Sequence, residues 1–327
     1  MKIAITGSIA TDHLMTFDGR FTDQLIAAKL ETLSLSFAVD DLEVRRGGVA
    51  ANICFGLGTL GLNPLLVGAA GHDFEPYRSW LDRHGVDTTG VRISATRRTA
   101  RFVCTTDRAH NQIGSFYAGA MAEARHIDLA AIGDRAGGLD LVMISPDDPA
   151  AMVRHTRQCA EAGIVFIADP SQQLARMTRD DARALLAGPR YLITNEYESV
   201  LIQELTGWTE QQILGRVGTW VTTRGADSVH LRQACRLSLD VKSVPAAGPL
   251  EPTGAGDAFR AGFLAALSRG LPEERAAQLG AAMATTALET VGTQTYVLQP
   301  ARLTAMIRDT YGVAAAEELS AHLAVLR

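Results

Sequence analysis

Lysine is nearly absent from this sequence, and its scarcity excludes one large class of phosphate-binding site. Only Lys2, Lys29 and Lys242 occur among the 327 residues, and none of them follows a glycine. A Walker-type P-loop needs glycine, lysine and then serine or threonine, because the lysine contacts the phosphates. The protein-kinase motifs are missing too, since there is no His-Arg-Asp tripeptide and Asp73-Phe74 is followed by glutamate. Any phosphate site must be built in another way.

Paired cysteines, long apolar runs and excess positive charge are also lacking. The four cysteines, Cys54, Cys104, Cys159 and Cys235, are far apart and form no C-x-x-C pair, so we expect free thiols rather than structural zinc. No segment has the apolar length of a membrane span, and the first apolar run is too short for a signal sequence. With a formal net charge of -5 and a pI near 5.9, we expect a cytoplasmic protein that binds neither membranes nor nucleic acid.

Apolar, β-branched runs alternate with amphipathic stretches along most of the chain. The first run, residues 2–7, ends in glycine and predicts a buried strand that starts a parallel sheet. Strands alternating with helices favour right-handed βαβ units and an α/β fold whose central, mostly parallel sheet is covered on both faces. The other predicted strands are 65–71, 141–145, 164–169, 191–195 and 219–225, and the predicted helices are 47–61, 74–85, 148–162, 178–187, 196–206, 258–268, 273–289 and 301–326.

Two segments interrupt this alternation. The β-rich runs 99–107 and 112–119 are separated by the polar turn RAHN and therefore predict a hairpin. Short alternating stretches in 34–44 predict further strands outside the main sheet. Because no linker-like segment interrupts the Ala-rich C-terminal third, we expect one α/β domain over 1–327, with a small β lid built from about 9–46 and 97–119.

The segment PTGAGDAFRAGFLAAL (252–267) carries the strongest chemical signal. Gly254 and Gly256 permit tight backbone curvature, and the apolar periodicity that follows starts a helix. Because a helix N-terminus presents free N–H groups and the positive end of the dipole, the amides of residues 254–257 form a predicted anion hole for a phosphoryl group. Asp257 would lie beside that hole and accept a proton from an attacking hydroxyl. In the alternative interpretation, Asp257 only caps the helix.

This segment resembles the second signature of the ribokinase-like carbohydrate kinases, the PfkB family, in which Gly-Ala-Gly-Asp forms the anion hole and its aspartate activates the substrate hydroxyl. RRGGVAANICFGLGTLG (45–61) resembles the first signature, a Gly-Gly pair ahead of an asparagine. With TNEYE (194–198) and TTRG (222–225) in family order, the resemblance covers essentially the whole chain. It implies a ribokinase-like three-layer fold, ATP as phosphate donor and Mg²⁺ as cofactor.

On the donor side, the resemblance assigns roles residue by residue. Asn195 and Glu198 match the family's Asn-x-x-Glu, which holds the phosphates and organises Mg²⁺ largely through water. Thr223 and Gly225 match a strand edge beside the nucleotide, where backbone and nucleotide approach closely. The residues implied to serve catalysis or to bind the nucleotide and metal are Asp257, Gly254, Ala255, Gly256, Asn195, Glu198, Thr223 and Gly225.

On the acceptor side, GSIATDHL (7–14), SLSF (34–37) and DPSQQLAR (169–176) resemble segments of bacterial adenosine kinases that look like ribokinase. Asp12 matches the carboxylate that binds vicinal ribose hydroxyls, and two lid phenylalanines are implied to stack on the purine. A solvated loop aspartate and ordinary lid packing are the alternatives. The implied acceptor residues are Ser8, Asp12, Ser36, Gly47, Gly48, Asn52, Phe102, Phe116, Gln172, Gln173 and Arg176.

The implied activity is ATP-dependent phosphorylation of the 5′-hydroxyl of adenosine. A related kinase for ribose, fructose or another nucleoside is the alternative enzyme, and an inactive nucleoside sensor is the alternative outside enzymes. The sensor is disfavoured because binding alone needs no proton acceptor. Glu251 stands where the signature usually has aspartate, and TVGTQ (290–294) resembles the stretch near which family members hold K⁺. The resemblance also implies a homodimer through the lid strands.

Overall fold

A nine-stranded sheet forms the centre of the computed structural model, which describes residues 1–24, 36–248 and 251–323. The strand order is β13-β12-β11-β10-β9-β8-β1-β4-β5, in which the pairs β11–β12 and β12–β13 are antiparallel and the others parallel. The predicted α/β class with a mostly parallel sheet is thus confirmed. The strands are β1 (Ile3–Thr6), β4 (Leu65–Ala70), β5 (Asp87–Ile93), β8 (Leu141–Ile144), β9 (Val165–Ala168), β10 (Tyr191–Asn195), β11 (Thr219–Thr223), β12 (Ser228–Arg232) and β13 (Leu239–Lys242).

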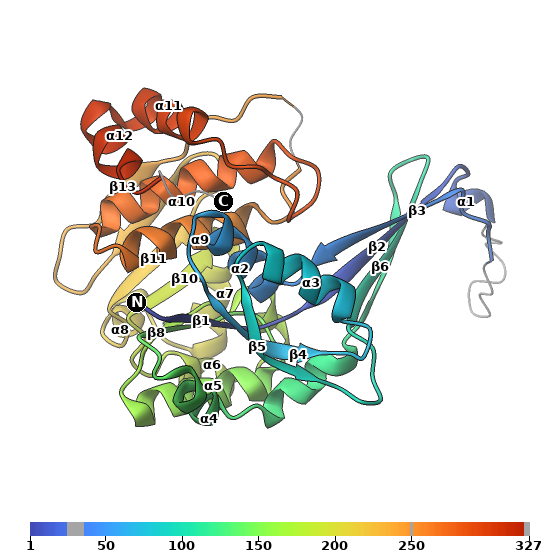
Figure 1. Ribbon diagram of the computed structural model, residues 1–327, viewed down its shortest axis with the longest axis horizontal. Helices are drawn as coiled ribbons and strands as arrows, with labels where there is room; N and C mark the ends of the chain where they lie inside the picture. Colours follow the sequence, from blue (N-terminus) through green and yellow to red (C-terminus); the bar gives the residue numbers. More distant parts are fainter. Residues whose placement is uncertain (25–35, 249–250, 324–327) are drawn as a thin grey trace.

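Side-chain alternation along the strands separates two cores. In β1, Ile3 and Ile5 belong to the core that contains α2, α9 and α10, whereas Ala4 belongs to the core that contains α4 and α5. Helices therefore cover both faces of the sheet, as Figure 1 shows. The helices are α1 (Phe21–Gln24), α2 (Val49–Thr59), α3 (Glu75–Arg83), α4 (Leu129–Ala136), α5 (Pro149–Ala162), α6 (Arg179–Leu185), α7 (Glu196–Thr206), α8 (Glu210–Leu214), α9 (Ala255–Ser268), α10 (Glu273–Leu288), α11 (Pro300–Tyr311) and α12 (Val313–Ser320), with 3-10 helices η2 (Gly119–His126) and η3 (Ser171–Arg176).

The C-terminal segment differs from the prediction. Residues 301–326 were expected to form one helix, but α11 and α12 are separate helices with Gly312 between them. Gly312 has φ 91°, which glycine adopts without strain, and its N–H still donates to the carbonyl of Arg308. The alanine-rich pattern on both sides hid this break. The strands β5, β12 and β13 were not predicted either; polar and apolar residues do alternate in β12 and β13, but over only five and four residues.

A second, four-stranded sheet projects from the side of the molecule (Figure 1). Its order is β3-β2-β6-β7, and β6 and β7 form the predicted hairpin. The register pairs Asp12 with Arg45 on one side and with Phe102 on the other, and Phe102 in turn with Phe116. Because directly paired residues share a face, these four side chains line one surface of the four-stranded sheet, which we call the lid sheet. Its strands are β2 (Ala10–Phe17), β3 (Asp41–Gly47), β6 (Ala100–Asp107) and β7 (Gln112–Tyr117).

Helices α2 and α9 approach each other closely through glycine. A Cβ added at Gly56 would lie 2.5 Å from the Cβ of Ala261, and one at Gly58 would lie 1.9 Å from the carbonyl oxygen of His84. Gly56, Gly58 and Gly61 have the spacing of a dinucleotide-binding turn, but the first two lie inside a buried helix rather than between a strand and a helix. They serve packing, and this packing brings the N-terminal turns of α2 and α9 together.

None of the helices in the described part of the chain combines the length and apolarity that a bilayer crossing needs. The four cysteines are free thiols, of which Cys54, Cys104 and Cys159 are buried and Cys235 is exposed.

Candidate active site

A cavity of about 240 Å³ opens where the lid sheet, η3 and the start of α9 meet. It lies beyond the carboxyl ends of the parallel strands, where ligands bind in open α/β sheets. Nine residues predicted from sequence contribute to its lining, which consists of Ser8, Ala10, Asp12, Gly48, Val49, Asn52, Phe116, Met121, Gln172, Gln173, Thr253, Gly254, Asp257 and Thr293. Residues more than 200 positions apart in the chain are thus brought to one cavity.

The first turn of α9 leaves amide groups available to an anion. Gly254 precedes the helix with φ 83°, and a Cβ there would lie 2.8 Å from Cγ2 of Thr293. The amide of Ala255 donates to the carbonyl of Pro252 at 3.3 Å. Among the described residues, the amides of Gly254, Gly256 and Asp257 donate no hydrogen bond. Three of the four amides predicted to form the hole are therefore free to bind a ligand, and that of Ala255 is already engaged.

Asp257 is held by its neighbours rather than used as a helix cap. Its Oδ2 accepts a hydrogen bond from Nδ2 of Asn52 at 2.8 Å, and Gly254 is the N-cap. The Oδ1 of Asn52 accepts from Thr293 Oγ1 at 3.0 Å and from Gln294 Nε2 at 2.8 Å, so the amide can present only its donor to Asp257. The capping interpretation of Asp257 is therefore not supported by its hydrogen bonds.

Burial raises the pKa of Asp257 to about 6, against the opposing effects of the Arg260 charge and the Asn52 hydrogen bond. The negative charge of Asp169 raises it further. A carboxyl with this pKa is largely ionised at neutral pH and still basic enough to take a proton, which suits a general base.

Asp12 lies on β2 with its carboxylate against β3. A Cβ on Gly47 would come within 2.9 Å of Oδ2 of Asp12, so the glycine makes room for this carboxylate. Burial raises the pKa of Asp12, while Arg45 opposes the shift. Phe116 lines the cavity with half of its surface exposed, whereas the ring of Phe102 on the same face lies over Gly114. The arrangement offers a carboxylate and an aromatic face to the same ligand.

Ser8 and Gly48 organise the start of α2. The Oγ of Ser8 accepts a hydrogen bond from the amide of Val49 at 3.0 Å and thereby caps the helix. Gly48 has φ 94°, and a Cβ there would lie 2.6 Å from the amide nitrogen of Ala10. Ser8 lines the cavity with its hydroxyl hydrogen still available, so its predicted contact with a base remains a prediction.

The loop after β9 adds further polar groups. Gln173 is buried, lines the cavity and has an Oε1 without a partner among the described residues, so an acceptor is available for a ligand hydroxyl. Gln172 also lines the cavity and accepts a hydrogen bond from Ser171. Arg176 and Ser36 are exposed and do not belong to the lining. Ser34 and Leu35 of the quoted SLSF segment lie outside the described residues.

The residues assigned to the nucleotide lie at the ends of neighbouring strands, because Asn195 of β10 pairs in register with Thr223 of β11. Asn195 and Glu198 form a capping box for α7, with the backbone amide of each donating to the other's side chain at 2.8 Å. Ser171 Oγ also donates to Glu198 at 3.3 Å. A Cβ on Gly225, which has φ 54°, would meet no atom within 4 Å, so this strand end is open. None of these residues lines the 240 Å³ cavity.

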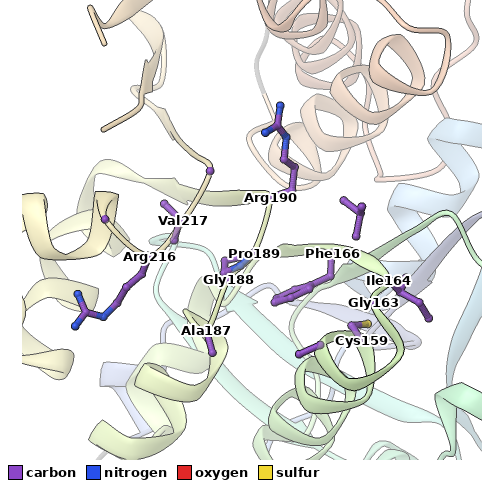
Figure 2. Close-up of a pocket in the computed structure, with 14 residues that line it drawn as sticks. Cys159, Gly163, Ile164, Phe166, Ala187, Gly188, Pro189, Arg190, Arg216 and Val217 are labelled. Carbon is purple, nitrogen blue, oxygen red and sulfur yellow. The ribbon is translucent and has the colours of Figure 1, made fainter. Parts of the chain in front are cut away.

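A larger hollow of about 590 Å³ lies at the opposite ends of the strands (Figure 2). Its lining includes Val165, the first residue of β9, and Arg190 and Gly218, which immediately precede β10 and β11. In Figure 2, the side chains of Arg190 and Arg216 point away from each other, and no carboxylate belongs to the lining. This hollow lacks converging acid and base groups, so we place the chemistry in the smaller cavity.

Residues 12–300 match the model described as "pfkB family carbohydrate kinase". The chain belongs to this family. Its fold is ribokinase-like, and it is a kinase that acts on nucleosides or sugars.

Relatives of this kinase include two archaeal proteins named nucleoside kinase. That of Methanothermobacter thermautotrophicus is 30% identical over 270 residues, which cover 80% of this chain and 84% of the relative. That of Methanocaldococcus jannaschii is 25% identical over 296 residues, covering 90% and 92%. Among solved structures, the Burkholderia thailandensis nucleoside kinase in complex with inosine is 32% identical and covers 95% of this chain and 98% of that one, with a TM-score of 0.82. The same protein was solved with ADP and inosine, with a TM-score of 0.80.

Sequence reasoning overlooked several residues of this site. Thr253 and Thr293 line the cavity, and Thr293 donates to Asn52. Thr253 immediately precedes the glycine signature, and Thr293 lies in the segment considered only for K⁺. The buried pair Arg260–Asp169 was also missed, although an arginine on the apolar, Ala-rich α9 was a visible signal.

Proposed function

We propose that this kinase transfers the γ-phosphate of ATP to the 5′-hydroxyl of a purine nucleoside, with adenosine as the principal acceptor, giving AMP and ADP. The observation that carries the proposal is the position of Asp257, beside three available amides at the wall of a cavity that also presents Asp12 and Phe116. A proton acceptor and an anion hole at one point are the requirements of phosphoryl transfer.

The acceptor nucleoside is held by groups from three segments. The Asp12 carboxylate accepts hydrogen bonds from the ribose 2′- and 3′-hydroxyls, because two donors on adjacent carbons suit its two oxygens. Gln173 supplies a further acceptor from η3. Phe116, joined by Phe102 on the same lid face, stacks on the base, an interaction worth about 1–3 kcal/mol per base. Stacking favours a nucleoside over a free sugar.

The chemical step uses positioning and charge stabilisation. Asn52 fixes the Asp257 carboxylate, which takes the proton as the 5′-hydroxyl oxygen attacks phosphorus and ADP leaves in line. The amides of Gly254, Gly256 and Asp257 stabilise the charge on the transferring phosphoryl oxygens. The lid sheet over the cavity limits access of water, which would otherwise compete as acceptor.

Magnesium and potassium belong to the proposal as cofactors. The buried Glu198 carboxylate already accepts hydrogen bonds from Asn195 and Ser171, which fits a group that holds Mg²⁺ through water rather than directly. In the described part of the chain, no three His, Cys, Asp or Glu side chains form a metal cluster. Glu198 would therefore hold Mg²⁺ together with ligands from outside the protein. Mg²⁺ neutralises phosphate charge when bound. The 290–294 segment is proposed for K⁺, through backbone carbonyls.

A panel of acceptors tests the activity. ADP release is measured with ATP over adenosine, inosine, guanosine, ribose and fructose, with and without K⁺. We expect adenosine to give the highest kcat/KM. Because the B. thailandensis relative was solved with inosine, inosine is the first rival. A preference for ribose or fructose would overturn the stacking argument, and nucleoside binding without ADP release would indicate a sensor.

We also propose a cytoplasmic homodimer formed through the outer face of the lid sheet. The register places Leu42, Val44 and Ile113 on the face opposite Asp12, and all three are about half exposed. Burying such an apolar surface against a second copy removes it from water. In analytical ultracentrifugation, Val44→Asp is expected to produce monomers. The matched control Val313→Asp alters an equally exposed valine on α12 and should leave the dimer intact; a monomeric wild type would contradict the proposal.

A further inference from the structure

Arg260 has no part in the mechanism above, yet it lies one turn after Asp257 on α9 and is buried. Its partner Asp169 follows the end of β9 and has no exposed surface. Nε of Arg260 donates to Oδ2 of Asp169 at 2.7 Å and Nη2 donates to Oδ1 at 2.5 Å, a bidentate pair. A buried ion pair stabilises a fold weakly, since desolvation offsets the attraction, so stability alone does not account for this one.

The third contact of the guanidinium reaches the anion hole. Nη1 of Arg260 donates to the carbonyl of Gly256 at 3.0 Å. A Cβ added at Gly256 would lie 2.9 Å from the same Nη1. Gly256 has no positive φ, so its backbone conformation does not demand glycine. The absent side chain at Gly256 thus leaves room for the guanidinium of Arg260 beside the first turn of α9.

The pair also joins the two sides of the cavity. Asp169 immediately precedes Pro170 and η3, which carries Gln173 into the cavity lining. Arg260 therefore ties the loop that contacts the acceptor to the turn that carries Asp257 and the free amides.

We propose that Arg260 is a positioning residue for phosphoryl transfer: clamped by Asp169, its guanidinium holds the Gly256 carbonyl, orients the first turn of α9 and supplies positive charge beside Asp257. This inference rests on the proposed function and deepens it. A merely structural role has a different consequence: replacing both members of the pair by apolar side chains would then leave stability and kcat nearly unchanged.

Charged and titratable groups surround Asp257 from several elements. Arg260 lies on its own helix, Asp169 just after β9 and Tyr296 after α10, while Glu198 on α7 faces the Arg260–Asp169 pair. Arg260 lowers the pKa of Asp257, whereas Asp169 raises it. Asn52 of α2 also faces the carboxylate but is neutral. Arg260 and Asp169 therefore shift the pKa of Asp257 in opposite directions, so removing each of them should move this pKa in a different direction.

The experiment compares the pH dependence of kcat/KM for adenosine in Arg260→Met and Asp169→Asn. In Arg260→Met, which lacks the cation, the acid limb of the pH profile should move to higher pH by about one unit or more. In Asp169→Asn, which lacks the second carboxylate, the acid limb should move to lower pH. We expect kcat of Arg260→Met to fall by about 100-fold, because the first turn of α9 loses its orientation. Arg260→Lys retains the charge and should keep the acid limb near that of the wild type, while losing the bidentate geometry.

The double variant Arg260→Met with Asp169→Leu separates positioning from folding. It removes both buried charges, so it is expected to fold as well as the wild type and still to show the reduced kcat. A folded double variant with wild-type kcat, or single variants whose acid limbs move in the same direction, would overturn the inference. If the single variants fail to fold, the double variant alone tests the inference: a reduced kcat supports it, and a wild-type kcat refutes it.

Failure of the proposed function is distinguishable from failure of this inference. A wild-type protein that phosphorylates none of the panel's acceptors refutes the function. The ¹³C titration of the Asp257 carboxyl, assigned by its loss in Asp257→Asn, then reports the same two shifts without turnover. Opposite shifts in Arg260→Met and Asp169→Asn support the placement of Arg260, and unchanged titration refutes it.

Discussion

Helices α2 and α9 begin alike and serve different purposes. Each follows a glycine with positive φ, Gly48 at 94° and Gly254 at 83°, and neither glycine can supply a side-chain cap. Each carries a polar side chain in its first turns, and these two side chains, Asn52 and Asp257, meet at 2.8 Å. The difference lies in the amides. Ser8 satisfies the first amide of α2, whereas three amides at the start of α9 have no acceptor among the described residues.

This contrast shows how one helix start becomes a scaffold and the other a binding site. Free helix-terminal amides in contact with solvent cost little, and the helix dipole favours an anion beside them. At α2, the capped terminus holds Asn52 rigidly, so that Asn52 in turn holds Asp257. The two helix starts should therefore respond differently to substitution.

The largest effect is expected at Asp257 itself. Asp257→Asn removes the proton acceptor while retaining the shape of the side chain, so kcat should fall about 1,000-fold, within the range expected for a general base. KM for adenosine should change little, because Asp12 and Phe116 remain. The control is Asp309→Asn, an exposed aspartate on α11. Steady-state ADP release measures both, and near-normal turnover in a folded Asp257→Asn protein would refute the mechanism.

Alanine substitutions at Gly254 and Gly48 should have different effects, because the helices that follow these glycines have different roles. Gly254→Ala strains a positive φ and drives Cβ toward Thr293 Cγ2, which displaces the free amides, and we expect kcat to fall about 100-fold. Gly48→Ala meets backbone atoms of Ser8 and Ala10 at 2.6 Å, so its main effect should be a lower free energy of unfolding. Denaturant unfolding and kcat are measured for both. The same loss of kcat at equal stability in both variants would contradict the contrast.

The stability of the protein should depend on pH through Asp257. Its pKa is raised in the folded state to about 6 from an ordinary 3.8, so the stabilising effect of the bound proton is present below about pH 4 and is lost as the pH rises through 6. Asp257→Asn mimics the protonated form and should therefore be more stable than the wild type by about 3 kcal/mol at pH 8. The difference should shrink to below about 1 kcal/mol at pH 4. Urea unfolding at both pH values measures it, and a difference independent of pH would contradict this prediction.

The smallest effect concerns the cap of α2. Ser8→Ala removes the acceptor for the Val49 amide and should lower the free energy of unfolding by about 1 kcal/mol. Turnover should change only a few-fold, since Asn52 keeps its bonds to Thr293 and Gln294. Thermal unfolding and ADP release check both. A large loss of kcat at unchanged stability would mean that the Ser8 hydroxyl contacts the substrate directly.

Local sequence patterns predict many structural features of this protein. The β-branched runs predict the strands of the parallel sheet, the RAHN turn predicts the β6–β7 hairpin, and the segment 252–267 predicts both a helix start and a carboxylate beside it. Local signals suffice for these features, because strand alternation, turn chemistry and glycine at a helix start depend on neighbours in the chain. The break between α11 and α12 at Gly312 was not predicted, because apolar periodicity continues on both sides of it.

Only the tertiary structure decides which distant residues act together. The sequence around Arg260 does not identify its partner Asp169, which lies 91 residues earlier. Likewise, the sequence around Asn52 does not identify Asp257, which lies 205 residues later. These contacts exist because α2 packs on α9 through Gly56 and because the residue that follows β9 reaches Arg260 of α9. Burial then sets the charge state of Asp257, and burial is a property of the packed molecule. The local pattern determines which chemical groups are present, whereas packing determines which of them lose water and meet.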